Sequence, residues 1–180
     1  MKLLKQKLIW LTFGLVVFAG QATAQNKSFD QSVLSVDGKK AYEALLKVNL
    51  FAIGPIGYGA STPAGKESLD ILIGEDLAVS ALKSLIGEAT PEGGLYAVLG
   101  LKTLKCECLD DEVKKFNDRT FSERKRWGRG VVASENVSRM SGCIAFEEKR
   151  SDVLERIIKG EYDNWINSRR VNRWSKEKGR

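Results

Sequence analysis

The sequence predicts a mainly α fold, in which HEAT-like paired helices are followed by a small extended or hairpin segment and a C-terminal helix. Two observations lead to this class. Leucine-rich segments between residues 66 and 105 repeat their apolar residues at spacings of three and four, which is the period of an amphipathic helix. After residue 130, Val131-Val132-Ala133 and Cys143-Ile144-Ala145-Phe146 have the composition of short strands or extended segments. There is room for one or two HEAT-like units, which is too few for a true solenoid.

The expected helices follow one another closely, and several begin at a residue suited to capping. Thr90 is expected to cap the helix that starts at Pro91, Asp110 to cap a further short helix, and Ser151 to cap a helix that ends at Gly160. The helices are expected at 38–51, 66–73, 75–89, 91–105, 110–117 and 151–159, with a last turn at 161–166. Strands are expected at 131–133 and 143–146, flanking a polar turn, and a solvated turn is expected at 147–150.

The first 24 residues have the pattern of a cleavable secretory signal. A basic head with three lysines precedes 13 apolar residues and the exit Ala22-Thr23-Ala24. Because such a run spans only about 20 Å as a helix, it is short for a membrane anchor. We expect cleavage after Ala24, a periplasmic or secreted product and no transmembrane segment thereafter. Residues 25–37 should form a flexible segment, 38–166 a single helical domain and 167–180 a basic tail.

Charge and composition exclude several functions. Without the leader's three lysines, 26 basic and 23 acidic residues remain, a net charge of +3 that gives no reason to expect a nucleic-acid partner. The chain contains no histidine. This excludes Ser-His-Asp and Cys-His catalysis and His-ligated zinc. We expect no metal, no cofactor and no catalytic residue.

The three cysteines predict one disulfide and one free thiol in an oxidising compartment. Cys106 and Cys108 are separated by one residue, a spacing that we interpret as too short for comfortable pairing. We therefore expect Cys108 to pair with Cys143, with Cys106 as the alternative partner.

The Gly- and Pro-rich stretch from Gly54 to Lys66 is the first candidate site. A loop of this length in a compact domain is often functional, and Tyr58, Ser61 and Thr62 are its candidate ligand-binding residues. Its end resembles a phosphate-binding loop, but Glu67 stands where the magnesium-binding hydroxyl belongs. A turn followed by a capped helix is the simpler interpretation.

Other motifs have simpler structural interpretations. Ser80 and Lys83 have the spacing of a histidine-free nucleophile and base, but they are expected on the polar side of a helix. The acids at 107–112 suit a helix N-terminus. Two basic clusters, at 119–129 around Trp127 and at 169–180 around Trp174, suit an anionic envelope surface or a solvated tail.

Three motifs resemble a family. The stretches Gly-Tyr-Gly-Ala-Ser-Thr-Pro-Ala-Gly at 57–65, Thr-Pro-Glu-Gly-Gly-Leu-Tyr-Ala-Val-Leu-Gly-Leu at 90–101 and Ser-Gly-Cys-Ile at 141–144 resemble exported bacterial proteins without an assigned function. The resemblance covers residues 38–166 and implies a fold and a location.

These observations favour an exported, non-catalytic binding or interaction protein, whose partner is an envelope protein or the anionic envelope surface. The alternatives are a histidine-independent envelope enzyme that uses carboxylates or thiols, and an inhibitor or immunity protein.

Overall fold

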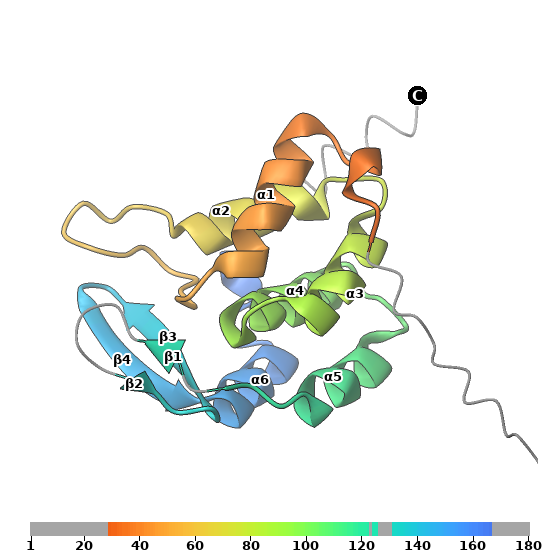
Figure 1. Ribbon diagram of the computed structural model, residues 1–180. Coiled ribbons are helices and arrows are strands. Elements are labelled where there is room, and N and C mark those ends of the chain that lie inside the picture. Colours follow the sequence, from red (N-terminus) through yellow and green to blue (C-terminus); the bar gives the residue numbers. More distant parts are fainter. Residues whose placement is uncertain (1–28, 123, 126–130, 167–180) are drawn as a thin grey trace, which may run out of the picture.

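The computed structural model describes residues 29–122, 124–125 and 131–166. The predicted leader (1–24) and the basic tail (167–180) lie outside these ranges, as does Trp127. Six α-helices and four short strands make up most of the described chain (Figure 1). The expected fold class is confirmed, since the described chain is mainly helical and has a small antiparallel hairpin and a C-terminal helix.

The helices lie close to their predicted positions. They are α1 (Val36–Lys47), α2 (Ala64–Ile73), α3 (Ala78–Glu88), α4 (Pro91–Thr103), α5 (Leu109–Asp118) and α6 (Arg150–Lys159), with 3-10 turns η1 (Gln31–Val33) and η2 (Asp163–Trp165). Consecutive helices pack as pairs, α1 against α2 and α3 against α4. Among the described helices, none is long and apolar enough to cross a bilayer.

Helix α4 is the centre of the core. Thr90 caps it by accepting a hydrogen bond from the Gly93 N–H at 3.1 Å, and Pro91 occupies the first turn. Every residue from Pro91 to Leu101 is buried, because α1, α2, α3, α5 and α6 all contact this helix. A helix that is apolar on all sides is stable only inside a protein, and α4 occupies that position here.

The segment before α1 contains regular structure in its described part. Of the residues 25–37 that we expect to be flexible, the structure describes 29–37, where η1 and the first residues of α1 form and Leu34 is buried. The cap is Ser35, whose hydroxyl oxygen accepts from the Gly38 N–H at 3.0 Å. Ser35 in turn donates from its N–H and its hydroxyl to the carboxylate of Glu75. This contact joins the start of α1 to the turn after α2.

The strand prediction requires a correction. Strand β3 (Asn136–Ser141) occupies the segment expected to be a polar turn, and it pairs antiparallel with β4 (Ile144–Lys149). Along β3 buried and more exposed residues alternate, with Val137 and Arg139 buried, but Arg139 is charged. A second small pair joins β1 (Arg124–Lys125) to β2 (Val131–Val132).

The start of α6 also differs from the prediction. Residues 147–149 belong to β4, and the helix begins at Arg150. Ser151 therefore lies in the first turn, where its hydroxyl donates to Asp152 at 3.0 Å, and Lys149 occupies the capping position. The predicted solvated turn is wrong because the strand continues directly into the helix. Gly160 ends α6 in a left-handed conformation, as expected.

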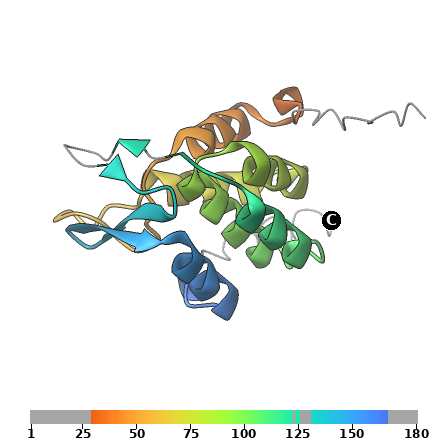
Figure 2. The same ribbon diagram turned by 60° about the horizontal axis from the view of Figure 1, so that its bottom comes forward.

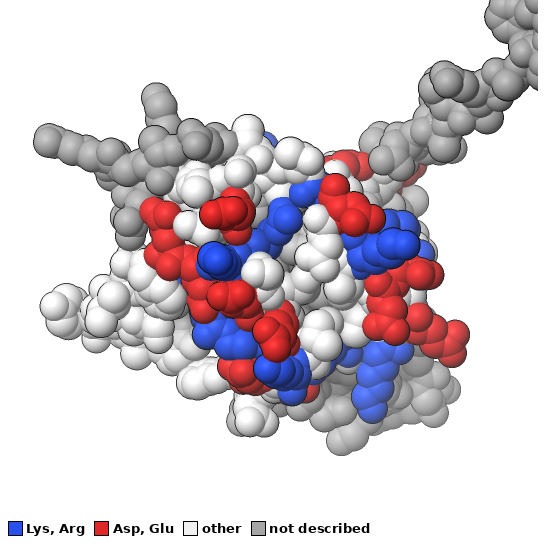
Figure 3. Space-filling model, turned by 90° about the horizontal axis from the view of Figure 1, so that it is seen from below, with Lys and Arg blue, Asp and Glu red and all other residues white. Residues whose placement is uncertain are grey.

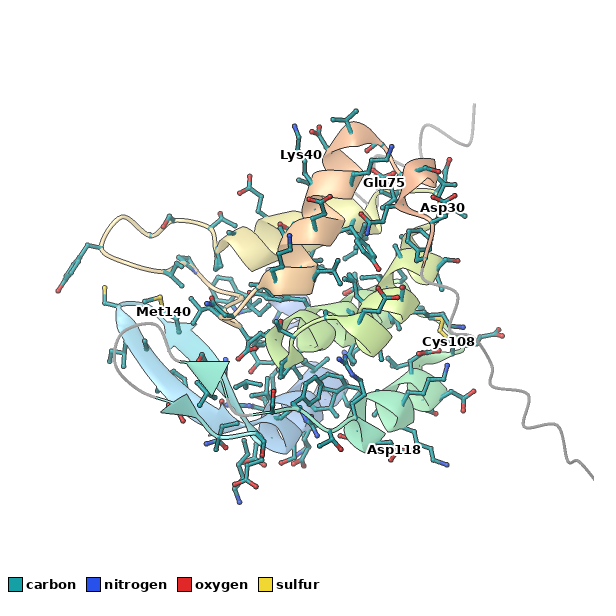
Figure 4. The ribbon with its side chains drawn as sticks, viewed as in Figure 1. Asp30, Lys40, Glu75, Cys108, Asp118 and Met140 are labelled. Atoms are coloured by element: carbon teal, nitrogen blue, oxygen red, sulfur yellow. A yellow bond between two sulfur atoms is a disulfide. The ribbon has the colours of Figure 1, made fainter. Side chains whose placement is uncertain are left out.

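The disulfide prediction is wrong. Cys106 pairs with Cys108, and Cys143 is a free, exposed thiol. The chain reverses between α4 and α5 through Lys105, whose φ is 53°, and this turn places the two Cα atoms 5.1 Å apart, within the usual range for a disulfide. Cys143 follows β3, and Figure 4 shows Met140 of β3 on the side of the molecule opposite Cys108. Neither proposed bridge to Cys143 is therefore present.

Candidate functional site

The candidate site is a projection built from two segments that are far apart in the sequence. Loop 54–63 lies between Phe51, which pairs with β3, and helix α2. The turn between β3 and β4 lies beside this loop in both Figure 1 and Figure 2. We call residues 55–62 and 141–145 the tip. All of these residues are exposed except Ile56, which is partly buried.

Backbone hydrogen bonds close the first segment into a narrow hairpin-like loop. The N–H of Ile56 donates to the carbonyl of Ser61 at 2.9 Å, and the N–H of Ser61 donates back to the carbonyl of Ile56 at 3.0 Å. The Ser61 hydroxyl donates to the same Ile56 carbonyl at 3.2 Å. The four residues between them, 57–60, form the end of the loop.

One hydrogen bond joins the two segments of the tip. The N–H of Gly57 donates to the carbonyl of Gly142 at 2.8 Å, which makes a parallel bridge between Ile56 and Gly142. Gly57 has a φ of 71° and Gly142 a φ of 56°, in the left-handed region that glycine adopts without steric cost. The glycines in these two motifs are thus required by the turns that bring the segments together.

The tip carries no formal charge. Its thirteen residues include no Lys, Arg, Asp or Glu, although charged residues make up 29% of the chain. Two large side chains are exposed there, Tyr58 at 101% and Ile144 at 70%. In Figure 3 the left side of the molecule, where the tip projects, is white, and acidic and basic side chains alternate over the surface beside it. An exposed surface of this kind is typical of a contact site for another molecule.

The predicted ligand-binding residues all lie on this tip, but they differ in what they do. Tyr58 points into solvent and is free to contact a partner. The Ser61 hydroxyl is used to hold the loop closed. Thr62 is exposed beside it. Ligand binding by these three residues stays a prediction.

Sequence reasoning missed the second half of the tip. The disulfide predicted for Cys143 is absent and its thiol is exposed. Ile144 begins a strand, as predicted, but its side chain is exposed at the hairpin turn. The signal that was available is the absence of charge in both segments. Their proximity depends on the Gly57–Gly142 hydrogen bond, which no spacing in the sequence predicts.

The base of the hairpin is fixed to the helical core by its backbone. Phe51 pairs with β3, with its N–H donating to the Ser138 carbonyl at 2.8 Å and its carbonyl accepting from the Met140 N–H at 3.4 Å. The N–H of Ser138 donates to the buried carboxylate of Glu92 in the first turn of α4, at 2.9 Å. These contacts position the tip on a rigid support.

A partly buried ion cluster also supports this hairpin. Arg139 of β3 donates to Glu148 of β4 at 2.6 Å, and Arg156 of α6 pairs with the other oxygen of Glu148. Burial works against the charged carboxylate, but hydrogen bonds from Arg139 and then Arg156 outweigh it and lower the pKa of Glu148. The Arg139 guanidinium also lies 5.5 Å from the ring centroids of Phe146 and Tyr162.

The phosphate-loop and Ser-Lys motifs are parts of the scaffold. Lys66 is buried and pairs with Asp70, one turn later in α2, at 2.6 Å. Lys83 lies 3.5 Å from Glu112, so its ammonium pairs with a carboxylate rather than activating Ser80. In both motifs the lysine therefore forms an ion pair within the helical scaffold.

The acidic and basic clusters are also used within the fold where they are described. Asp110, Asp111 and Glu112 form the first turn of α5, and Glu112 is buried against Lys115 at 2.6 Å. The predicted cap at Asp110 is wrong, because the helix begins at Leu109 and Cys108 occupies the capping position. Within residues 29–122, 124–125 and 131–166, no group of His, Cys, Asp and Glu has an arrangement that would hold a metal ion.

Arg119, from the first basic cluster, closes the end of α3. Its guanidinium donates to the carbonyls of Ile86 and Ala89, the latter at 2.9 Å, and lies 4.4 Å from the Phe121 ring centroid. Burial and then the charge of Arg150 lower the pKa of Arg119. The other basic side chains of this cluster, around Trp127, lie outside the described structure. The cluster around Trp174 lies wholly outside the described residues.

Comparisons with known proteins give no further assignment. A scan against protein-family models, a search of the curated proteins and a search of the solved structures each return no match. The resemblance to exported bacterial proteins therefore stays a prediction.

Proposed function

We propose that this chain is an exported, non-catalytic binding protein that contacts an envelope protein through its tip. The observation that carries the proposal is the exposed, uncharged tip with Tyr58 and Ile144 at its end. Export is supported by the leader pattern of residues 1–24.

The composition of the tip favours a protein partner over an anionic membrane surface. Binding to anionic lipid depends on Lys and Arg near the surface, and the tip has none. Protein interfaces, in contrast, have cores depleted in charge and enriched in aromatic residues such as tyrosine. A small, narrow projection held by its own hydrogen bonds loses little conformational entropy when it enters a concave surface.

An inhibitor or immunity protein is the same kind of molecule with a toxic enzyme as its partner. The proposal covers it, and identification of the partner decides between the two.

The test is affinity capture from an envelope extract, using the chain expressed with its own leader. Three proteins are compared: the wild type, the tip variant Tyr58→Ser/Ile144→Ser, and the control Val36→Ser/Leu77→Ser. The control removes two exposed apolar side chains at 69% and 42% exposure, away from the tip. Proteins enriched with the wild type are identified by mass spectrometry and then purified for a direct binding measurement.

We expect the wild type and the control to bind the purified partner alike, and the tip variant to bind at least about ten-fold more weakly. Central apolar and aromatic contacts often contribute more than 1 kcal/mol each, and ten-fold corresponds to about 1.4 kcal/mol. Equal binding by all three proteins would exclude the tip as the contact surface. If the purified wild type instead sedimented with anionic vesicles that contain no other protein, the membrane surface would be favoured as its partner.

A further inference from the structure

The disulfide between Cys106 and Cys108 is poorly suited to stabilising the fold. A disulfide stabilises chiefly by restricting the unfolded chain, and the restriction grows with the number of residues in the closed loop. This loop contains one residue, Glu107, between the two cysteines. A bridge to Cys143 would have closed a loop of more than thirty residues, and that cysteine is left as a free thiol. Because the closed loop is so short, stabilising the fold does not by itself account for this pair.

The fold holds the two sulfur atoms together at an accessible place. The pair lies in the turn between α4 and α5, where both cysteines are partly exposed. The Cys106 N–H donates to the Leu101 carbonyl at 3.0 Å, and the Leu109 N–H donates to the Cys106 carbonyl at 3.1 Å. Because these backbone bonds do not involve the sulfur atoms, the turn has the means to keep the two thiols close after reduction.

The two sulfur atoms are not equivalent. Cys108 occupies the N-cap of α5, a helix of 10 residues, where a thiolate is favoured by the helix N-terminus. The Cys108 N–H itself donates to the sulfur of Cys106 at 3.3 Å. The position of Cys108 at the helix N-terminus favours a departing Cys108 thiolate, whereas the N–H donated to the Cys106 sulfur favours a departing Cys106 thiolate. An incoming thiolate can therefore attack either sulfur.

The charges around the pair select its partners. Three exposed carboxylates, Glu107, Asp110 and Asp111, lie on or beside the turn and outnumber the exposed ammonium of Lys105 before Cys106. Glu112 is buried and paired with Lys115. An exposed acidic rim repels anionic thiols and attracts basic ones. It also opposes formation of a thiolate on Cys108, so the rim favours partners that bring positive charge with them.

We propose that Cys106–Cys108 is a redox-active disulfide that exchanges with dithiols in basic polypeptide segments. This inference does not depend on the proposed function, because the pair and the tip lie on opposite sides of the molecule, as Cys108 and Met140 of β3 show in Figure 4.

The exchange balances without a further reagent. When a substrate thiolate attacks the sulfur of Cys106, a mixed disulfide forms, the Cys106–Cys108 bond breaks, and the Cys108 thiolate takes a proton from solvent; attack on Cys108 follows the same steps with the two cysteines exchanged. The second substrate thiolate then attacks the substrate sulfur of the mixed disulfide, and Cys106 leaves and is protonated. The substrate dithiol loses two electrons and two protons to become a disulfide, and the cysteine pair gains them.

The first test measures whether the pair exchanges in the folded protein. The full chain carrying Cys143→Ser, which removes the exposed third thiol, is equilibrated with neutral 2-mercaptoethanol and its disulfide at a series of ratios. Thiols are then alkylated and counted by mass, while circular dichroism reports that the protein stays folded. We expect the pair to pass from oxidised to reduced within the series, with the helical signal unchanged. A pair that stays oxidised at every ratio, or that is reduced only as the protein unfolds, would overturn the proposal.

The second test measures partner selection. The oxidised Cys143→Ser protein is mixed with two synthetic dithiol peptides that differ only in having Lys or Glu beside the cysteines. We expect stoichiometric oxidation of both, at least ten-fold faster for the Lys peptide at low salt. Asp110→Asn/Asp111→Asn should reduce this preference, and Lys40→Gln, on the remote helix α1, should leave it unchanged. Equal rates for the two peptides would overturn the assigned class of partner, and no transfer to either would overturn the activity.

Discussion

Gly93 marks a place where two helices, α1 and α4, approach closely. A Cβ atom built at this position would lie 2.1 Å from the carbonyl oxygen of Leu45 in α1, and the helix backbone has little freedom to move away. Gly93→Ala should therefore lower the free energy of unfolding by about 3 kcal/mol, at the upper end for overpacking. Urea denaturation followed by circular dichroism measures the change.

Gly87 provides the control for this substitution, because it is also a helical glycine but a methyl group added to it would meet no other atom within 4 Å. Gly87→Ala should raise stability by about 0.5–1 kcal/mol, the usual difference between the two residues in a helix. If both substitutions had the same effect, the close approach of α1 and α4 would not be a feature of the protein in solution.

At the scale of the element, the hairpin depends on one carboxylate. Glu148 pairs with Arg139 and Arg156, and the Arg139 side chain is only 9% exposed. Glu148→Gln would leave a buried guanidinium without its counter-charge, which should cost about 3 kcal/mol. Glu155→Gln removes a comparable pair with Lys159 in which both side chains are more than 60% exposed, and it should cost less than about 0.5 kcal/mol. Equal losses for the two variants in urea denaturation would contradict this account of the cluster.

The same carboxylate predicts a pH dependence. Since its pKa is lower in the folded protein than in the unfolded chain, Glu148 stabilises the fold above its unfolded pKa, and this contribution is lost as the pH falls through the folded pKa. The stability difference between the wild type and Glu148→Gln should thus be constant near neutral pH and shrink on acidification from about pH 5 to about pH 3. Unfolding free energies of both proteins across this range check it, and a difference that grew on acidification would have the wrong sign.

The elements differ in how far their sequence predicts them, for physical reasons. The helices were predictable because local signals suffice, such as the Thr90 cap and the apolar residues of α4. The start of α1 was missed because the Ser35 cap is supported by Glu75, forty residues away. A small hairpin was predicted, but its strand β3 was missed because β3 directs Arg139 inward, and a charge at an inward position conceals the alternation that identifies a strand.

At the scale of the whole molecule, the cysteine pairing predicts how stability is distributed. The three-residue loop closed by Cys106 and Cys108 should contribute about 1.5 kcal/mol, whereas the bridge from Cys108 to Cys143 would have contributed about 4 kcal/mol. Cys106→Ala/Cys108→Ala should therefore cost no more than about 2 kcal/mol in urea denaturation. Peptide mapping without reduction should find Cys143 open to alkylation, and a peptide linking it to either other cysteine would contradict the structure.

The candidate site was predictable only in part, again because of its long-range contacts. Tyr58 and its loop could be singled out from glycine and proline content alone. The second segment, with Ile144, joins the tip through a hydrogen bond between residues 57 and 142. Such a juxtaposition follows from the packing of the hairpin on the core, which local patterns do not specify.

The arrangement of the tip on its support predicts that binding and stability are separable. Tyr58 and Ile144 project beyond the contiguous core, and the backbone bonds that shape the tip do not involve their side chains. Tyr58→Ser/Ile144→Ser should change the free energy of unfolding by less than about 0.5 kcal/mol, as is usual for exposed positions. Phe51→Ala, at the fully buried base of the tip, should cost about 3–5 kcal/mol. Urea denaturation of both variants beside the wild type measures this contrast. A loss above about 2 kcal/mol in the tip variant would mean that these side chains support the fold, and weaker partner binding could then no longer be assigned to a lost contact.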